Sequence, residues 1–202
     1  MSLTKIANNV FNVVGAACIG VNLTAGFAQA QSNSSLSFYN THTEETVRAN
    51  PNTRAGRAAI NSILRDHRRN EAVVMDTELL DLLRDMQASL LARDPNRPIV
   101  FHVISGYRSQ QTNNALRRNG GGQAVNSRHS HGDAIDIRVP GVSLRELRSV
   151  AWCLQRGGVG SYARDNFVHV DTHRSRVRDS RFPGGVRFRA WGWSPSPNQC
   201  RG

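Results

Sequence analysis

Apolar side chains recur at the three- and four-residue spacing of an amphipathic helix in three parts of the chain, and a further short helix is predicted around Ala115 and Leu116. In chain order, these four helices are expected at about residues 55–67, 76–93, 115–118 and 143–156. Asp76 can accept a hydrogen bond at the start of the second helix, and Ser143 followed by Glu146 is typical of a capping box at the start of the fourth. Glycines follow the third and fourth stretches, where a helix is expected to end.

Shorter stretches show the two-residue alternation or the β-branched composition of strands. They lie at about residues 36–39, 99–104, 134–139 and 167–172, with a further edge strand at 186–190. Helices come first, and strands then alternate with helices through short connections. This order predicts an α+β domain.

Two of the predicted strands place polar side chains on the face that does not enter the core. In residues 134–139 the apolar side chains alternate with Asp136, and in residues 167–172 they alternate with His169 and Asp171. His129 precedes the first of these strands, and Gly132 can let the chain turn back toward Asp136. If the two strands pair, His129, Asp136 and His169 converge on one point.

Two imidazoles and one carboxylate around an open position are the ligand set of a catalytic zinc ion, because the fourth position must hold water or substrate. Such an ion lowers the pKa of bound water to about 7 and polarises a carbonyl group. The same spacing also occurs where histidine and aspartate only hydrogen-bond, and spacing by itself favours that structural interpretation.

The residues from Ser127 to Asp136 resemble a family signature. Ser127-x-His129-x-x-Gly132-x-Ala134-x-Asp136 matches the signature of the D-alanyl-D-alanine type zinc metallopeptidases, which include VanX, murein endopeptidases and the hedgehog-like fold. Further stretches resemble the murein endopeptidase K branch: residues 37–43, 105–109, 112–113, 140–144, 157–160 and 167–172. The resemblance covers about residues 36–175.

The resemblance implies a small antiparallel sheet with helices packed on one side, and a zinc peptidase domain over residues 36–178. It implies that His129, Asp136 and His169 bind Zn²⁺, and that Arg108 contacts the substrate carbonyl or the oxyanion. A guanidinium keeps its charge and can stabilise developing negative charge, which makes this role of Arg108 reasonable. The alternative for Arg108 is a structural salt bridge.

The general base is less clear, because the chain departs from better-known members of the family. Many of them carry glutamate three residues before the last zinc histidine, or histidine two before it, where this chain has Asn166 and Phe167. Asp171 is the best candidate, since it shares a strand face with His169. Its alternative role is to accept a hydrogen bond from a ligand imidazole. His131 and His173 are further candidates, and Ser127 can orient a ligand.

The chain is strongly basic, with a formal net charge of +11, and Lys5 is its only lysine. Residues 1–30 are typical of a secretory signal peptide, with an apolar stretch and a final Ala-Gln-Ala. We therefore expect export to the periplasm, a flexible lead-in at 31–35 and a basic tail at 179–202. The apolar stretch is too short to cross a bilayer, so no membrane span is expected in the mature protein.

Two cysteines, Cys153 and Cys200, stay in the mature chain if cleavage follows Ala30. In an oxidising compartment they can form a disulfide, but two free thiols are equally compatible with the sequence. Their spacing is not that of metal ligands.

We expect an exported zinc metallopeptidase that hydrolyses amide bonds in peptidoglycan stem peptides or cross-links, as a D,D- or L,D-endopeptidase or a carboxypeptidase. A non-catalytic, zinc-containing peptidoglycan-binding module is the alternative, because the usual base is missing. The charge also suits a nucleic-acid binder, but the chain carries no zinc-finger spacing or RNA-binding aromatic signature, so no nucleic-acid partner is expected. The sequence leaves the linkage and the oligomeric state open.

Overall fold

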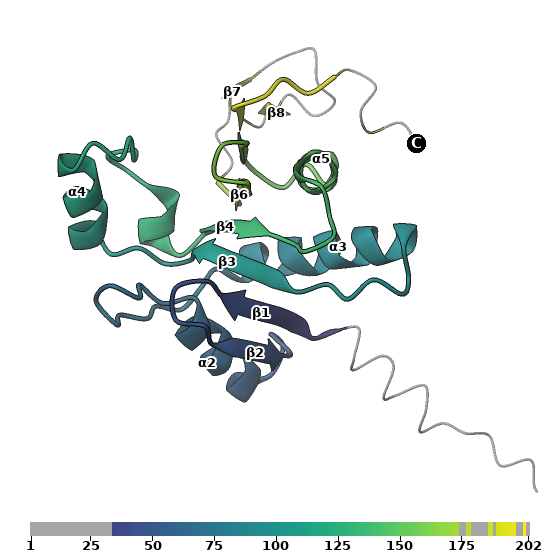
Figure 1. The fold of residues 1–202 in the computed structure, drawn as a ribbon, viewed down its shortest axis with the longest axis horizontal. Coiled ribbons are helices and arrows are strands. Elements are labelled where there is room, and N and C mark those ends of the chain that lie inside the picture. Colours follow the sequence, from purple (N-terminus) through teal and green to yellow (C-terminus); the bar gives the residue numbers. More distant parts are fainter. Residues whose placement is uncertain (1–33, 174–176, 179–185, 188, 197–199, 201–202) are drawn as a thin grey trace, which may run out of the picture.

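A seven-stranded mixed sheet organises the part of the chain that the structure describes (Figure 1). The structure is a computed structural model, and it describes residues 34–173, 177–178, 186–187, 189–196 and 200. The strand order in the sheet is β2-β1-β3-β4-β6-β5-β9. The α+β class predicted from the sequence is confirmed.

The strands of this sheet are β1 (Leu36–Asn40), β2 (Thr46–Ala49), β3 (Phe101–Ser105), β4 (Ala134–Arg138), β5 (Val159–Tyr162), β6 (Phe167–Asp171) and β9 (Ala190–Trp191). A separate pair consists of β7 (Val177–Arg178) and β8 (Val186–Arg187). The helices are α2 (Arg54–Ile63), α3 (Thr77–Arg93), α4 (Gln110–Arg118) and α5 (Leu144–Cys153), with a short 3₁₀ helix η1 (Arg128–His131).

The centre of the sheet is antiparallel, as expected, but its outer parts make it larger and mixed. β3 pairs with β4, β4 with β6 and β6 with β5 in antiparallel fashion, whereas β1 runs parallel to β3 and β9 runs parallel to β5. β2 and β5 lie outside the strands predicted from the sequence, because each has only four residues and no regular apolar alternation.

Helices α2, α3 and α5 pack on one face of the sheet and build a single apolar core, to which α4 contributes no side chain. α3 buries Leu79, Leu83 and Met86, and the same cluster contains Ile60 of α2 and Leu147 of α5. The predicted caps are confirmed, since the side chains of Asp76 and Ser143 accept hydrogen bonds from backbone amides in the first turns of α3 and α5. The strands contribute one side chain in two to this core: Phe38, Phe101, Val103, Ile135, Ile137, Val168 and Val170.

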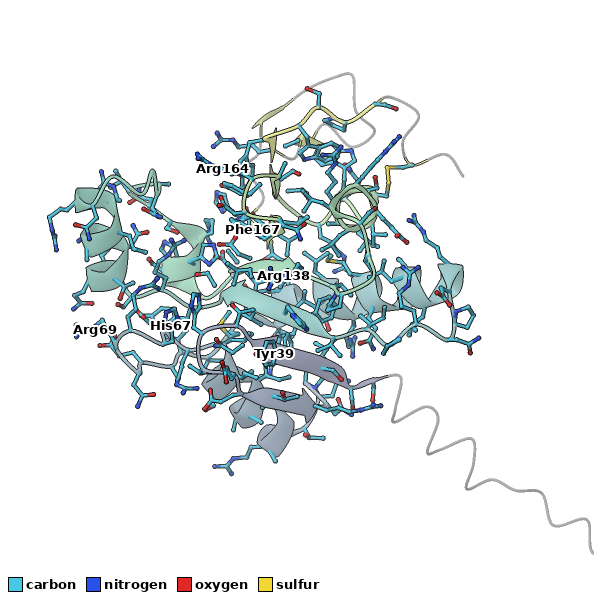
Figure 2. The ribbon with its side chains drawn as sticks, in the orientation of Figure 1. Tyr39, His67, Arg69, Arg138, Arg164 and Phe167 are labelled. Atoms are coloured by element: carbon cyan, nitrogen blue, oxygen red, sulfur yellow. A yellow bond between two sulfur atoms is a disulfide. The ribbon has the colours of Figure 1, made fainter. Side chains whose placement is uncertain are left out.

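The opposite face of the sheet carries polar and aromatic side chains, as the alternation predicted. Tyr39 pairs with His102, and His102 with Arg138, across β1, β3 and β4. Tyr39, Arg138 and Phe167 are labelled on this part of the molecule in Figure 2. Asp136 and His169 are paired residues of β4 and β6 on the same face.

Gly132 makes the turn that brings η1 against the start of β4. Its φ of 75° lies in the left-handed region that glycine adopts without a steric penalty. The carbonyl of Gly132 also accepts a hydrogen bond from the amide of Asp76, which ties the turn to the start of α3. The predicted return of the chain toward Asp136 therefore takes place here.

The C-terminal part of the chain is joined to the domain at β9 and at a disulfide. Cys153 at the end of α5 is bridged to Cys200, so of the two alternatives for these cysteines the structure has the bridge. The expected edge strand at 186–190 corresponds to β8 and the start of β9, and Ala190–Trp191 of the predicted basic tail is part of the main sheet.

The predicted signal peptide, residues 1–30, lies outside the described residues, as do residues 31–33 of the predicted lead-in. The last two lead-in residues are described: Ser34 accepts a hydrogen bond from Asn50, and Ser35 accepts one from Gln87. Within the described part of the chain, each helix is too short or too polar to cross a membrane.

Candidate metal centre

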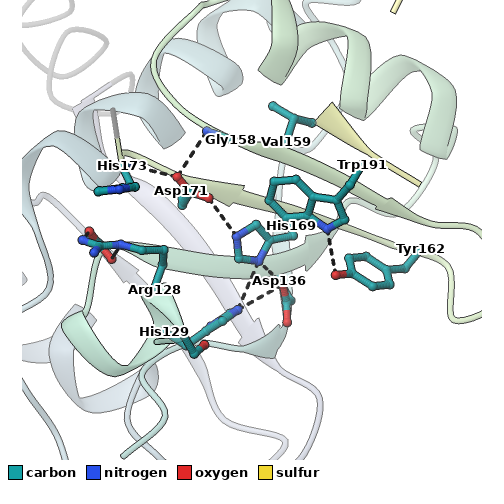
Figure 3. A network of polar contacts seen from close by, with 12 residues as sticks. Arg128, His129, Asp136, Gly158, Val159, Tyr162, His169, Asp171, His173 and Trp191 are labelled. Atoms are coloured by element: carbon teal, nitrogen blue, oxygen red, sulfur yellow. Dashed lines mark hydrogen bonds and ion pairs between the residues drawn. The ribbon is translucent and has the colours of Figure 1, made fainter. Parts of the chain in front are cut away.

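Three elements bring His129, Asp136 and His169 together (Figure 3). His129 comes from η1, Asp136 from β4 and His169 from β6. Their exposed fractions are 3%, 8% and 8%, so all three are buried. The convergence predicted from strand parity is present in the structure.

The three inward donor atoms have the spacing that a tetrahedral cation requires. His129 Nε2 lies 3.2 Å from His169 Nδ1 and 3.3 Å from Asp136 Oδ1, and His169 Nδ1 lies 2.8 Å from Asp136 Oδ1. Ligands about 2.0–2.1 Å from a tetrahedral zinc ion are separated by about 3.3 Å. The donor set and its spacing therefore fit such an ion.

The outer nitrogen of His129 is bonded in a way that leaves the inner nitrogen free to coordinate. His129 Nδ1 lies 2.8 Å from the carbonyl oxygen of Gly106. Because a carbonyl only accepts, Nδ1 is the donor, and Nε2 of a neutral ring then presents its lone pair to the centre.

His169 follows the same rule with its nitrogens exchanged. Its Nε2 lies 3.2 Å from Asp171 Oδ2, and its Nδ1 faces Asp136 and the centre. The other oxygen of Asp171 accepts hydrogen bonds from the backbone amides of Gly158 and His173, at 3.2 and 2.9 Å. The carboxylate of Asp171 is thus held against the side of His169 that points away from the centre. This position favours the orienting role of Asp171 over the role of general base.

The centre stabilises positive charge. Burial lowers the pKa of His169, but hydrogen bonds with Asp136 and Asp171 outweigh it and raise this pKa to about 9. Burial raises the pKa of Asp136, yet the neighbouring His129 and His169 hold it well below its usual range. Burial likewise raises the pKa of Asp171, and its hydrogen bond with His169 outweighs burial and lowers it. A metal cation bound by the three donors would take the place of the proton on His169 Nδ1.

Arg108 is buried close to the centre without an ion-pair partner among the described residues. Its Nη2 donates to Ser127 Oγ at 3.4 Å, and its buried Nε has no hydrogen-bond partner in the described part of the chain. Burial lowers the pKa of Arg108, and the charge of Asp136 opposes this effect. The alternative role of Arg108 in a structural salt bridge is therefore not seen among the described residues. The guanidinium still has an N–H group, at Nε, that can donate a hydrogen bond to a ligand. Ser127, which we expected to orient a metal ligand, contacts Arg108.

The remaining base candidates do not join the three donors. His131 and His173 are exposed, and neither belongs to the donor cluster found among the described residues. Asn166 has a φ of 53° in the turn between β5 and β6. Phe167 stacks on Tyr162, with ring centroids 4.4 Å apart.

Trp191 and Tyr162 lie beside the centre and were not among the predicted site residues. The Trp191 and His169 ring centroids are 5.0 Å apart, and Trp191 Nε1 donates to the hydroxyl of Tyr162 at 2.8 Å. The strand β9 has two residues, too few for a periodic signal. Gly160 was a usable signal, because glycine inside a strand marks a close approach of another group.

Comparison with known proteins shows that the three donors lie within a stretch of the chain that matches a known family. The family model described as peptidoglycan L,D-endopeptidase MepK matches residues 28–178. The chain is 38% identical over 146 residues to the peptidoglycan L,D-endopeptidase MepK of Escherichia coli K12, covering 70% of this chain and 78% of that protein. It is 43% identical over 110 residues to the probable peptidoglycan L,D-endopeptidase MepK of Haemophilus influenzae, covering 54% and 57%. No solved structure matches.

The donor geometry predicts one metal ion per chain. After chelator treatment and reloading with Zn²⁺, wild-type protein should bind one equivalent, measured by elemental analysis and isothermal titration calorimetry. His129→Ala or Asp136→Ala should weaken binding by more than about 100-fold, since loss of groups that only orient metal ligands already costs about 10- to 100-fold. His131→Ala is the control and should bind zinc normally. Unchanged zinc affinity in His129→Ala would contradict the assignment.

Proposed function

The chain belongs to the peptidoglycan L,D-endopeptidase MepK family, and on that premise we propose that it hydrolyses amide bonds in the stem peptides or cross-links of peptidoglycan. The observation that carries the proposal is the convergence of His129, Asp136 and His169 with both rings oriented for coordination. The names of the relatives support an L,D linkage as the bond that is cut.

The family is metal-dependent, and the ion we propose for this chain is Zn²⁺. It would be held by His129 Nε2, Asp136 Oδ1 and His169 Nδ1. Three protein ligands without cysteine leave a position for water or substrate, which is typical of catalytic zinc sites. Zinc bound there supplies a water of lowered pKa and a Lewis acid for the scissile carbonyl.

Arg108 would bind the substrate carbonyl oxygen and the negative charge that develops on it. Its buried position supports this role, because electrostatic interactions are stronger where water is excluded. The charge of Asp136 opposes the lowering of the Arg108 pKa by burial, which supports a position of the guanidinium within electrostatic reach of the centre.

Asp171 would orient His169. Its two oxygens are occupied by His169 and by two backbone amides, so the carboxylate fixes the ring with Nδ1 toward the centre. Carboxylates in this position raise the basicity of metal-ligating histidines and fix their tautomer.

Peptidoglycan lies outside the cytoplasmic membrane, so a protein that cuts it must be exported. We propose that residues 1–30 are the signal peptide and that the mature protein works in the periplasm. The basic surface would assist its approach to an anionic envelope polymer.

A non-catalytic peptidoglycan-binding module is the second candidate. Asn166 in a tight turn and Phe167 stacked on Tyr162 support it, because the glutamate or histidine that serves as general base in better-known zinc metallopeptidases is absent from these positions.

Hydrolysis of purified cross-linked muropeptides separates the two candidates. Zinc-loaded wild-type protein should release new muropeptides detectable by mass spectrometry, whereas chelator-treated protein and His129→Ala should release none. The masses of the products identify the bond. Binding of muropeptides by the zinc-loaded protein without any new product would support the module instead.

Arg108→Ala should lower kcat/KM by about 100- to 1,000-fold, because the developing negative charge loses its donor. Zinc content should stay at one equivalent, and Arg108→Lys should restore part of the rate. The matched control is Arg117→Ala, which removes an exposed arginine from α4. Wild-type kcat/KM in Arg108→Ala would exclude this role.

Asp171→Asn should weaken zinc binding by about 10- to 100-fold, as expected when the partner of a ligand histidine is changed. The carboxylate of Asp171 accepts hydrogen bonds with both oxygens, one from His169 and the other from two backbone amides. Asparagine has a single acceptor oxygen, and its NH₂ group only donates, so it cannot replace both sets of hydrogen bonds. Excess zinc should restore most of kcat. If Asp171 is the general base, zinc affinity will instead stay normal and kcat will be lost at saturating zinc.

A further inference from the structure

Trp191 lies in register with a metal-site residue across three neighbouring strands. In β9 and β5, Trp191 is paired with Gly160, and in β5 and β6, Gly160 is paired with His169. Side chains at paired positions point to the same face of a sheet. The indole therefore projects on the face that carries the donor atoms, next to His169 (Figure 3).

Two glycines leave the space that the indole occupies. A Cβ atom on Gly160 would lie 2.4 Å from two indole atoms, and one on Gly158 would lie 3.0 Å from a third. Any side chain at Gly160 would thus displace Trp191 from its place beside His169.

The segment that carries Trp191 is held at several further points. Trp193 packs edge-on against Trp152, lies under the guanidinium of Arg148 and donates to the carbonyl of Val159. Cys200 is bridged to Cys153. Residues 189–200 lie beyond the region that matches the family, which ends at residue 178.

The indole offers an apolar surface at the site. Its only polar atom, Nε1, already donates to Tyr162, and the side chain is partly exposed. Tyr162 in turn is 38% exposed and stacks on Phe167. An aromatic surface of this kind, next to the donors, suits the aliphatic part of a peptide residue beside the bond to be cut.

We propose that Trp191 is a substrate-contacting residue, which forms an aromatic wall beside the metal centre and binds the aliphatic portion of a stem-peptide residue. The disulfide-bridged C-terminal segment holds this wall in place. The inference rests on the proposed function for the identity of the ligand, and it adds a part of the site that the family match does not contain.

The test compares Trp191→Ala, Trp191→Phe, Gly160→Ala and the control Val74→Ala, which trims an exposed valine remote in sequence from the site. The dissociation constant of a cross-linked muropeptide is measured on full-length, chelator-treated protein by calorimetry. KM, kcat and zinc content are measured on the zinc-loaded protein. Binding without zinc keeps the test independent of hydrolysis, so failure to cleave would remove the proposed function alone.

Trp191→Ala should raise both the dissociation constant and KM about tenfold, which corresponds to about 1.4 kcal/mol of lost aromatic contact. Zinc content and kcat should change little. Gly160→Ala should have the same effect, and Trp191→Phe should recover most of the affinity. Unchanged muropeptide binding in Trp191→Ala would overturn the proposal. So would loss of zinc with normal muropeptide binding, since Trp191 would then only support His169.

A double-mutant cycle tests the role of the disulfide. Cys200→Ser should weaken muropeptide binding because the segment loses an anchor, and adding it to Trp191→Ala should cause no further loss. Fully additive effects of the two substitutions would show that the disulfide does not act through Trp191.

Discussion

The pairing of Asp136 with His169 between β4 and β6 is the constraint on which the rest of the site depends. In a strand, successive side chains point to opposite faces, so a shift of one residue would bury both polar groups in the apolar core. The register is fixed by the core itself, since Ile135, Ile137, Val168 and Val170 all lie buried on the other face. The hydrophobic pattern thus places the donors before any metal is considered.

The buried charges around this pair are balanced among themselves. Two carboxylates lie with His129 and His169 in a region from which water is largely excluded, and removing unpaired charges from water is costly. A shared proton or a cation between the donors offsets that cost. The pKa of His169 is raised because its protonated ring is stabilised by the two carboxylates. The hydrogen bonds to Gly106 and Asp171 leave His129 Nε2 and His169 Nδ1 facing the centre, so backbone and sheet geometry set which ring nitrogens a cation there would meet.

Strand alternation was sufficient to predict the faces of Asp136 and His169, and the family signature was needed to add His129, which lies in a turn without periodicity. The role of Asp171 could not be settled from the sequence, because it depends on which nitrogen of His169 it contacts. The parallel pairing of β1 with β3 and of β9 with β5 depends on contacts between segments far apart in the chain. The sequence also left open whether Cys153 and Cys200 form a disulfide or stay free, because their pairing depends on such long-range contacts.

Asn166 and Phe167 stand where better-known zinc metallopeptidases carry a glutamate or a histidine, and both have structural roles in this chain. Asn166 adopts a positive φ that asparagine tolerates better than glutamate, and it lines a separate cavity of about 350 Å³ with His102 and Arg138. Phe167 shares a face with His169 and stacks on Tyr162, which accepts the hydrogen bond of Trp191. Phe167 therefore supports Tyr162, the residue to which Trp191 is hydrogen-bonded.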